Sequence, residues 1–223
     1  MFLAVAILGP LVAAAMTVRW ALTRVDALGR PRSFPVVSTV LPLVLAVVAA
    51  VPVVRHARVE AQLGQVASQL VGHPVRVRCD TLSQELLSTH TELGYVQFGA
   101  DGRPEPVATV TSAACGDLTA WLGSRRANAP VEQLVAVHVL THEAMHLTGM
   151  RDEAQTECMA VQRDVRTATL LGATPGQARA LARLYWQIVY PDLPDNYRTA
   201  QCAEGGPLDE HLPDPPWAPV KTS

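Results

Sequence analysis

One segment organises the second half of the chain: residues 131–149, which read VEQLVAVHVLTHEAMHLTG. Pro130 comes directly before it, at the start of a helix, where the missing N–H of proline removes no hydrogen bond. No helix breaker follows until Gly149, and glycine commonly ends helices because it adopts the left-handed conformation without strain. We therefore predict an α-helix over Val131 to Thr148.

This helix carries the motif H-E-x-x-H, in which His142, Glu143 and His146 are the defined residues. Residues i and i+4 share one face of a helix, so both imidazoles point the same way and can bind a single Zn²⁺ ion. Glu143 is offset by about 100° and can reach a water molecule on the metal. With 7 histidines in 223 residues, chance produces this pattern in roughly one such chain in a hundred.

A catalytic zinc site needs a third protein ligand and one open coordination position. The residues after His146 offer three carboxylates, on Asp152, Glu153 and Glu157. Because Gly149 lets the chain turn back, one of them can return to the metal from the start of the next helix. Glu153 and Glu157 are again i and i+4, so one can bind the metal while the other hydrogen-bonds a ligand histidine and fixes its tautomer.

At these residues the chain resembles the gluzincin metallopeptidases, including the HtpX and CAAX-protease group and the single-domain minigluzincins. In these enzymes H-E-x-x-H is followed on a later helix by E-x-x-A-D or E-x-x-A-N, and residues 153–157, EAQTE, are similar to that box. The resemblance implies zinc ligands at His142, His146 and Glu153, a general base at Glu143 and a supporting carboxylate at Glu157. The linker of six residues between His146 and Glu153 is shorter than in most of that group, which keeps Glu157 open as the third ligand.

A second resemblance assigns a different third ligand. Residues 142–152 also read H-E-x-x-H-x-x-G-x-x-D, which is similar to a metzincin variant in which an Asp replaces the third His. That pattern implies Asp152 as the ligand. Because no clear Met-turn sequence follows, we prefer Glu153 and keep Glu157 and Asp152 as alternatives.

Other residues near this segment have two or more interpretations each. His138 extends the histidine stripe and is either a substrate contact or, more commonly, a histidine packed beside the site. Tyr185, Trp186 and Tyr190 either include a donor to the oxyanion of the reaction or belong to the core, the commoner case. Arg151 pairs with Asp152, binds a substrate carboxylate or is a solvated residue of the turn, which is again the commoner case.

Two uncharged stretches occupy the first quarter of the chain, Phe2 to Val18 and Ser33 to Val54. The second is about 33 Å long as a helix, enough to cross the hydrocarbon core of a bilayer. The first is at the short end of this range, and a secretory signal is its alternative interpretation, although the basic residues that begin such a signal are missing. We expect two transmembrane helices in contact with the lipid bilayer.

The loop between these stretches, residues 19–32, contains four arginines and one aspartate. Basic loops remain on the cytoplasmic side, so the domain after Val54 is expected to be extracytoplasmic at the cell membrane. All four cysteines follow the spans, and an even number of cysteines in an exported domain indicates disulfides. Of the three pairings we favour Cys79 with Cys115 and Cys158 with Cys202, because each joins neighbouring elements; the alternative is four buried thiols in a cytosolic domain.

The remaining patterns outline the other elements. Apolar residues at helical spacing predict a helix over His56–Gly72, and alternation predicts a strand over Pro74–Asp80. Further expected elements are strands over Leu93–Phe98 and Val107–Thr111 and helices over Ala114–Leu122, Asp152–Leu171 and Thr174–Val189. We therefore expect an α+β chain in three parts. These are a transmembrane helical hairpin at 1–54, a mostly helical zincin-like domain with a short antiparallel sheet at 55–193, and an irregular tail at 194–223.

The sequence thus predicts a membrane-anchored, extracytoplasmic zinc metallopeptidase that acts on peptides or proteins, with Glu143 as general base. The alternative is a non-enzymatic envelope module for binding or assembly, in which the zinc site is structural and its fourth coordination position is closed. A net charge of −2 and an aromatic content of 5% supply neither a basic surface nor stacking platforms, so nucleic acid is not an expected partner.

Overall fold

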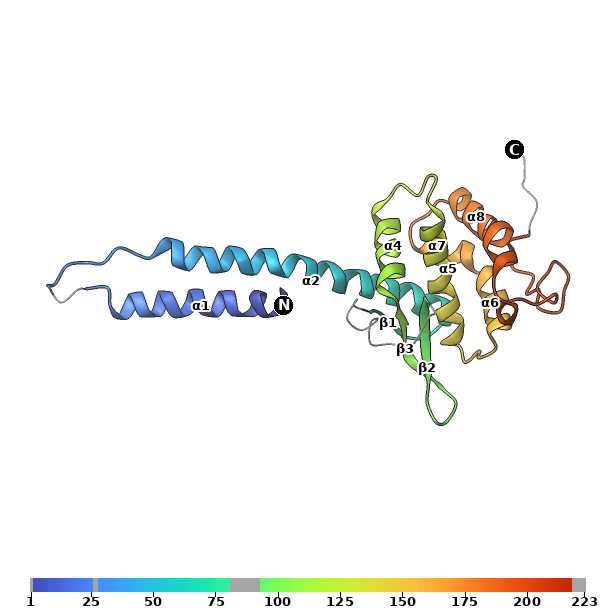
Figure 1. Ribbon diagram of the computed structural model, residues 1–223, viewed down its shortest axis with the longest axis horizontal. Helices are drawn as coiled ribbons and strands as arrows, with labels where there is room; N and C mark the ends of the chain where they lie inside the picture. Colours follow the sequence, from blue (N-terminus) through green and yellow to red (C-terminus); the bar gives the residue numbers. More distant parts are fainter. Residues whose placement is uncertain (1, 26–27, 81–92, 218–223) are drawn as a thin grey trace. The chain divides into compact units, whose positions relative to one another are not determined.

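The computed structural model describes residues 2–25, 28–80 and 93–217 (Figure 1). The chain divides into two compact units, Met1–Val59 and Glu60–Ser223. The tail that follows residue 193 belongs to the second unit. All residues of the H-E-x-x-H motif and the carboxylates after it also lie in the second unit.

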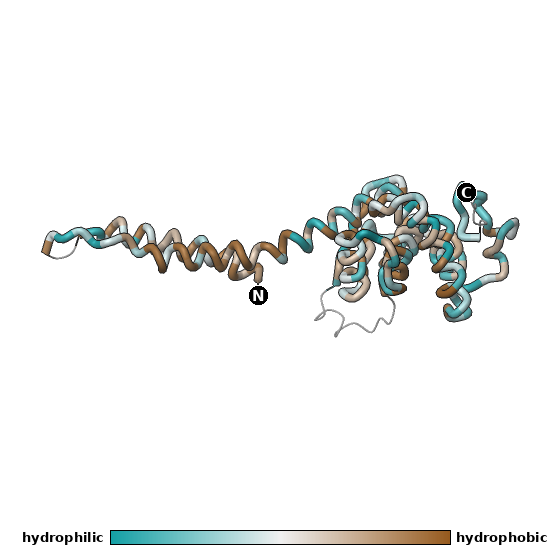
Figure 2. The backbone as a smooth tube through the Cα atoms, turned by 90° about the horizontal axis from the view of Figure 1, so that it is seen from above, coloured by the Kyte–Doolittle hydropathy of each residue, from teal (hydrophilic) through white to brown (hydrophobic). Residues whose placement is uncertain are grey.

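Two long apolar helices, α1 (Phe2–Leu22) and α2 (Val36–Val71), account for most of the first unit, and α2 continues into the second. Hydrophobic residues predominate along α1 and the first half of α2 (Figure 2). Each helix is long and apolar enough to cross a membrane, and its most apolar window is only 11% buried in α1 and 17% buried in α2. The core helix of a soluble protein has the same composition but is mostly buried, whereas most of the apolar surface of these two windows is exposed within the described residues.

The segment expected as a separate helix over His56–Gly72 is the C-terminal part of α2. The helix passes through Pro42 and Pro52 without ending. A single proline removes one backbone hydrogen bond and bends a helix, but apolar surroundings favour keeping the other bonds closed.

The sheet of the second unit contains β1 (Arg76–Cys79), β2 (Gly94–Phe98) and β3 (Pro104–Val110) in the order β1-β3-β2. β2 pairs with β3 antiparallel, whereas β1 pairs with β3 parallel. The expectation of a purely antiparallel sheet was therefore wrong, and the sheet is mixed. Alternation along a strand determines which side chains are buried, but it carries no information about the direction of the neighbouring strand.

Helix α5 (Val131–His146) is the central element of this unit and begins and ends close to the predicted residues. It contacts β2, β3 and four helical elements, α4, α6, α7 and η1 (Figure 1). Its last eleven residues are all buried. The three motif residues are among them, since His142, Glu143 and His146 are only 7%, 3% and 7% exposed. Buried polar groups need hydrogen-bond or metal partners, so the residues packed around α5 determine which partners these three side chains have.

The other helical elements surround α5. They are α4 (Ser112–Gly123), α6 (Glu153–Val161), α7 (Asp164–Leu170), α8 (Pro175–Leu184), the π-helical turn η1 (Tyr185–Val189) and the 3₁₀ turns η2 (Tyr190–Asp192) and η3 (Asp195–Tyr197). Thr174 is the N-cap of α8 and forms a full capping box with Gln177, as Thr174 followed by a first-turn proline predicts.

The single helix expected over Asp152–Leu171 was wrong, because the chain breaks between α6 and α7 at Gln162 and Arg163. The Gln162 amide donates to the carbonyl oxygen of Leu208 at 2.9 Å, and its oxygen accepts from the backbone N–H of Glu210 at 2.8 Å. Arg163 forms an ion pair with Glu210. The break therefore binds the C-terminal tail, a long-range contact that local periodicity does not reveal.

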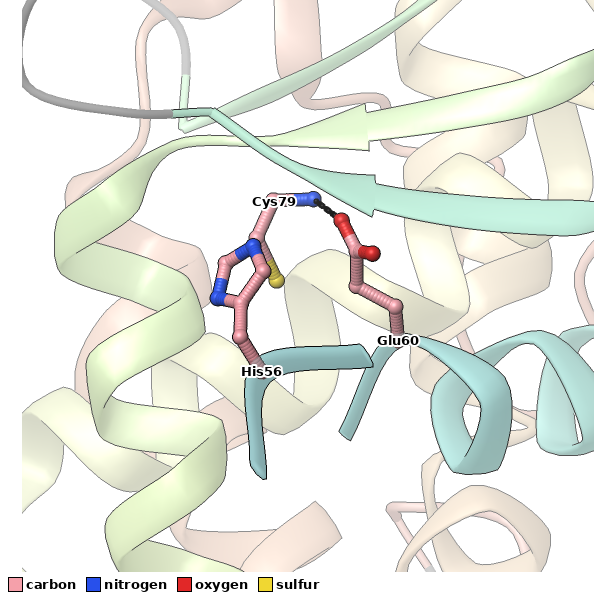
Figure 3. Close-up of side chains that lie close together, drawn as sticks. All are labelled: His56, Glu60 and Cys79. Carbon is pink, nitrogen blue, oxygen red and sulfur yellow. Dashed lines mark hydrogen bonds between the residues drawn. The ribbon is translucent and has the colours of Figure 1, made fainter. Parts of the chain in front are cut away.

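Both disulfides have the pairing that we favoured. Cys79 of β1 is bonded to Cys115 of α4, and Cys158 of α6 is bonded to Cys202 of the tail, with Cα–Cα distances of 5.8 Å and 5.6 Å. The backbone N–H of Cys79 also donates to the Glu60 carboxylate at 2.8 Å (Figure 3). The sulfur of Cys79 is bonded to that of Cys115, so Cys79 cannot act as a thiolate ligand of a metal ion.

Candidate metal centre

A tight turn brings the start of α6 back to the end of α5. Gly149 has a φ of 100°, which a residue with a side chain rarely adopts, and this turn reverses the chain after His146. Asp152 is the N-cap of α6, and its carboxylate accepts a hydrogen bond from the backbone N–H of Gln155 at 2.9 Å. The first residue of α6, Glu153, consequently lies opposite the two histidines of α5.

Three potential ligand atoms converge at this point. The Nε2 atoms of His142 and His146 are 3.0 Å apart, and the Oε2 atom of Glu153 lies 3.1 Å from the first and 3.3 Å from the second. Ligand atoms at about 2.0–2.1 Å from a tetrahedral zinc ion are separated by about 3.3 Å. The triangle formed by His142, His146 and Glu153 therefore has the dimensions of one face of a zinc coordination sphere.

The far side of each imidazole is held by an oxygen acceptor. Nδ1 of His142 lies 3.0 Å from Oε2 of Glu157, and Nδ1 of His146 lies 2.9 Å from the carbonyl oxygen of Met150. An N–H at Nδ1 donates to each of these oxygens, which leaves Nε2 with its lone pair toward the third ligand. Glu157 thus has the supporting position expected for the second glutamate.

The pKa values of the candidate ligands show which protons a metal ion would displace. Burial lowers the pKa of His142, but hydrogen bonds to Glu153 and Glu157 outweigh this and raise it to about 9. Burial raises the pKa of Glu153, and the hydrogen bonds from His142 and His146 reverse the effect and lower it to about 2. A divalent ion would replace the protons that these histidines otherwise hold, so metal binding should release protons.

A second group, formed by His138, His142 and Glu157, also meets the spacing for a metal ion. Both ring nitrogens of His138 already contact carboxylates, with Nδ1 at 2.9 Å from Asp164 and Nε2 at 3.0 Å from Glu157. The Tyr185 hydroxyl donates to the other oxygen of Glu157 at 2.8 Å. We interpret this group as a buried hydrogen-bond network that supports His142, because its polar atoms are satisfied without a metal.

The network places a cation between two anions inside the protein. Burial lowers the pKa of His138, but Asp164 and Glu157 outweigh this and raise it to about 10. The pKa of Glu157 is lowered, since its interactions with His138 and His142 outweigh its own burial. The His138 ring stacks on Tyr185 at a centroid distance of 3.7 Å, which fixes its orientation.

Replacing His138 with phenylalanine is expected to destabilise the protein by about 3–5 kcal/mol. The new ring keeps the stacking on Tyr185, but it leaves Asp164 and Glu157 buried without their shared cation. Urea unfolding of the full chain in mild detergent measures the loss. The matched control is His73→Phe at an exposed position, where a change within about 0.5 kcal/mol is expected. Equal stabilities for the two variants would contradict the network.

Glu143 is a residue of α5, and its side chain lies against the strand β2. A Cβ atom built on Gly94 would come within 2.7 Å of the Glu143 Oε1 atom, so a larger residue at this position would force the Glu143 side chain to move. Because β3 is the central strand, β2 is an edge of the sheet, and Gly94 is its first residue. The candidate base is thus packed against the end of an edge strand.

A cavity of about 900 Å³ opens over these groups. It is lined by β2, by α5 and α6 and by residues of the segment 193–197, and it includes His142, Glu143, His146 and Glu153. Tyr197 of η3 also lines it, with its ring 5.8 Å from that of His142. The sequence analysis missed Tyr197 because it treated the tail as irregular. The pairing of Cys158 with Cys202 was the available signal, since it requires the tail to lie beside α6.

The remaining candidates are distributed around this centre. Asp152 caps α6, Tyr185 donates to Glu157, and the Tyr190 hydroxyl donates to the carbonyl oxygen of Thr199 at 3.4 Å. Trp186 stacks on Tyr190 at 4.5 Å. Arg151 is exposed in the turn before α6, as the commoner interpretation predicts, and it also lines the cavity.

Comparison with known protein families, with curated proteins and with solved structures finds no match. The structure by itself shows a mostly helical α+β chain with two long apolar helices and a buried group of histidines and glutamates that could bind a metal ion.

Proposed function

We propose that this chain is a membrane-anchored zinc metallopeptidase in which His142, His146 and Glu153 bind the metal. The observation that carries the proposal is the convergence of three ligand atoms, separated by 3.0–3.3 Å, at a cavity that also contains Glu143. The resemblance of the motif and of residues 153–157 to the gluzincins supports the same ligand set. When bound, a zinc ion supplies a Lewis acid that polarises a peptide carbonyl and lowers the pKa of water.

The protein residues account for the rest of the reaction. Glu143 accepts a proton as water attacks the carbonyl carbon, and it returns that proton to the nitrogen as the C–N bond breaks. β2 is an edge strand of the described sheet, and the backbone N–H and C=O groups of an edge strand can pair with an extended peptide. Glu157 and the Met150 carbonyl keep the two imidazoles in the tautomer that zinc requires.

An open coordination position distinguishes an enzyme from the alternative, a structural zinc site in a binding or assembly module. Among the residues that the structure describes, the group of His142, His146 and Glu153 includes no fourth His, Cys, Asp or Glu. A structural zinc site is normally closed by four protein ligands. The three-ligand group beside a cavity therefore favours catalysis.

The proposed location is the cell membrane, with the metal centre on the extracytoplasmic side. The apolar helices α1 and α2 have the length and composition of membrane spans. The basic loop over residues 19–32 favours the cytoplasm, which assigns the second unit to the opposite side. Two disulfides are typical of a protein in an oxidising compartment.

Metal analysis and a cleavage assay on the same preparation test this proposal. The full chain, purified in mild detergent under oxidising conditions, is expected to contain about one equivalent of zinc. Cleavage of a peptide library should stop after treatment with a chelator and return when zinc is added. Bound zinc without any cleavage would favour the structural alternative, and absence of zinc binding would overturn both.

A further inference from the structure

Arg151 lines the cavity that also contains the candidate metal centre. Its guanidinium carbon is 4.6 Å from the centroid of the Phe98 ring, a cation–π distance, and this ring meets His146 edge-on at 6.4 Å. These two distances put the guanidinium carbon at most about 11 Å from the centre of the His146 ring. An extended peptide covers this distance in about three residues.

The charge of Arg151 is available to a ligand. Within the described residues, no Asp or Glu forms an ion pair with it, and no other Arg or Lys lines the cavity. Arg163 and Arg198, in contrast, are paired with Glu210 and Asp195. The stacking on Phe98 holds the guanidinium plane while its N–H groups stay free to donate, and this geometry suits a carboxylate.

Much of the rest of the cavity lining is apolar. The residues that form this part are Val96 and Phe98 of β2, Val135 and Val139 of α5, and Val189 and Leu193. An apolar pocket with a few convergent polar groups accepts an apolar side chain and orients it through the polar groups. The cavity therefore combines room for an apolar residue with one fixed positive charge.

We propose that Arg151 determines specificity by binding a carboxylate of the substrate, within about three residues of a scissile bond that adjoins an apolar residue. The carboxylate belongs either to an Asp or Glu side chain or to the C-terminus of the peptide. This inference rests on the proposed peptidase function, and it assigns to that function a substrate class, apolar peptides with a nearby negative charge.

Matched peptides test the proposal on the full chain in detergent with zinc bound. The best cleaved peptide from a library is resynthesised with each Glu or Asp replaced by Gln or Asn, and with its C-terminal acid replaced by an amide. For the parent protein, removing the critical carboxylate should lower kcat/KM about 10–100-fold, the effect of one charged hydrogen bond. The side-chain and amide series distinguish the two sources of the carboxylate.

The variant Arg151→Gln should cleave both members of the critical pair within about twofold of each other, because its amide cannot discriminate by charge. Arg151→Glu should reverse the preference toward a peptide with Lys at that position. Arg103→Gln is the control, because its side chain is 87% exposed and does not line the cavity, and it should keep the parental preference. Zinc content equal to that of the parent shows that each variant is folded at the metal centre.

Two results separate failure of the inference from failure of the proposed function. If the parent cleaves peptides without any preference for a carboxylate, or if Arg151→Gln keeps the parental preference, the role of Arg151 is overturned and the peptidase function remains. If the parent cleaves none of the peptides, calorimetric binding of the same matched pairs to the zinc-loaded protein tests Arg151 alone. Equal affinities for the acidic and neutral peptides would then overturn the inference as well.

Discussion

Glu143→Gln is expected to bind as much zinc as the parent chain and to lose peptide cleavage by about 10²–10⁴-fold. The amide has almost the shape of the carboxylate, so it still fits against Gly94. It has no basic oxygen to accept a proton from water at neutral pH, and this proton transfer is the contribution that Glu143 makes. Metal analysis and initial cleavage rates on one preparation measure both quantities.

The control for this variant is Glu132→Gln, an exposed position on the same helix. It changes the net charge by the same amount and should leave both the zinc content and the rate unchanged. A Glu143→Gln protein that cleaves as fast as Glu132→Gln would remove Glu143 from the mechanism. Loss of zinc in Glu143→Gln would instead show that this glutamate acts on the metal itself.

Glu153→Ala is expected to weaken zinc binding more than any other change among the three acidic candidates. Its Oε2 atom lies 3.1 Å and 3.3 Å from the two histidine nitrogens, so the alanine variant leaves a two-ligand site. Changes behind the ligands cost about 10–100-fold in affinity, and loss of a ligand should exceed about 100-fold. Competition with a chromophoric chelator measures the dissociation constant.

The neighbouring carboxylates provide matched controls. Glu157→Ala should weaken zinc binding by about 10–100-fold, because His142 loses the acceptor for its Nδ1. Asp152→Ala should keep the parental affinity and lose about 0.5–2 kcal/mol of stability, because this side chain caps α6. A larger loss of zinc in Asp152→Ala or Glu157→Ala than in Glu153→Ala would reassign the third ligand.

Much of the candidate site could be predicted from local spacing. The interval between His142 and His146 is one helical turn, and Gly149 ends the helix at a point from which Glu153 can return. These relations depend on residues close in sequence, whose separation in space follows from helix geometry. The favoured disulfide pairing also followed from neighbouring elements, and the observed bonds agree with it.

The parts that could not be predicted depend on contacts between distant residues. Asp164 meets His138 across a separation of 26 residues, and the Gln162 amide meets Leu208 across 46. Nothing in the local pattern distinguishes these partners from other polar residues of the same kinds. The same limit explains the wrong sheet direction, since the parallel pairing of β1 with β3 joins residues as distant in sequence as Arg76 and Val107.

The amino-acid sequence by itself determined the apolar helices, the histidine motif on its helix and the turn that follows, because each depends on chain-local geometry and hydrophobic periodicity. Tertiary structure alone decided which carboxylate faces the two imidazoles, which one supports them from behind, and that the tail forms a wall of the cavity. Burial is the physical reason. Once α5 is enclosed, its buried histidines need partners, and packing of other segments supplies Glu157 and Asp164.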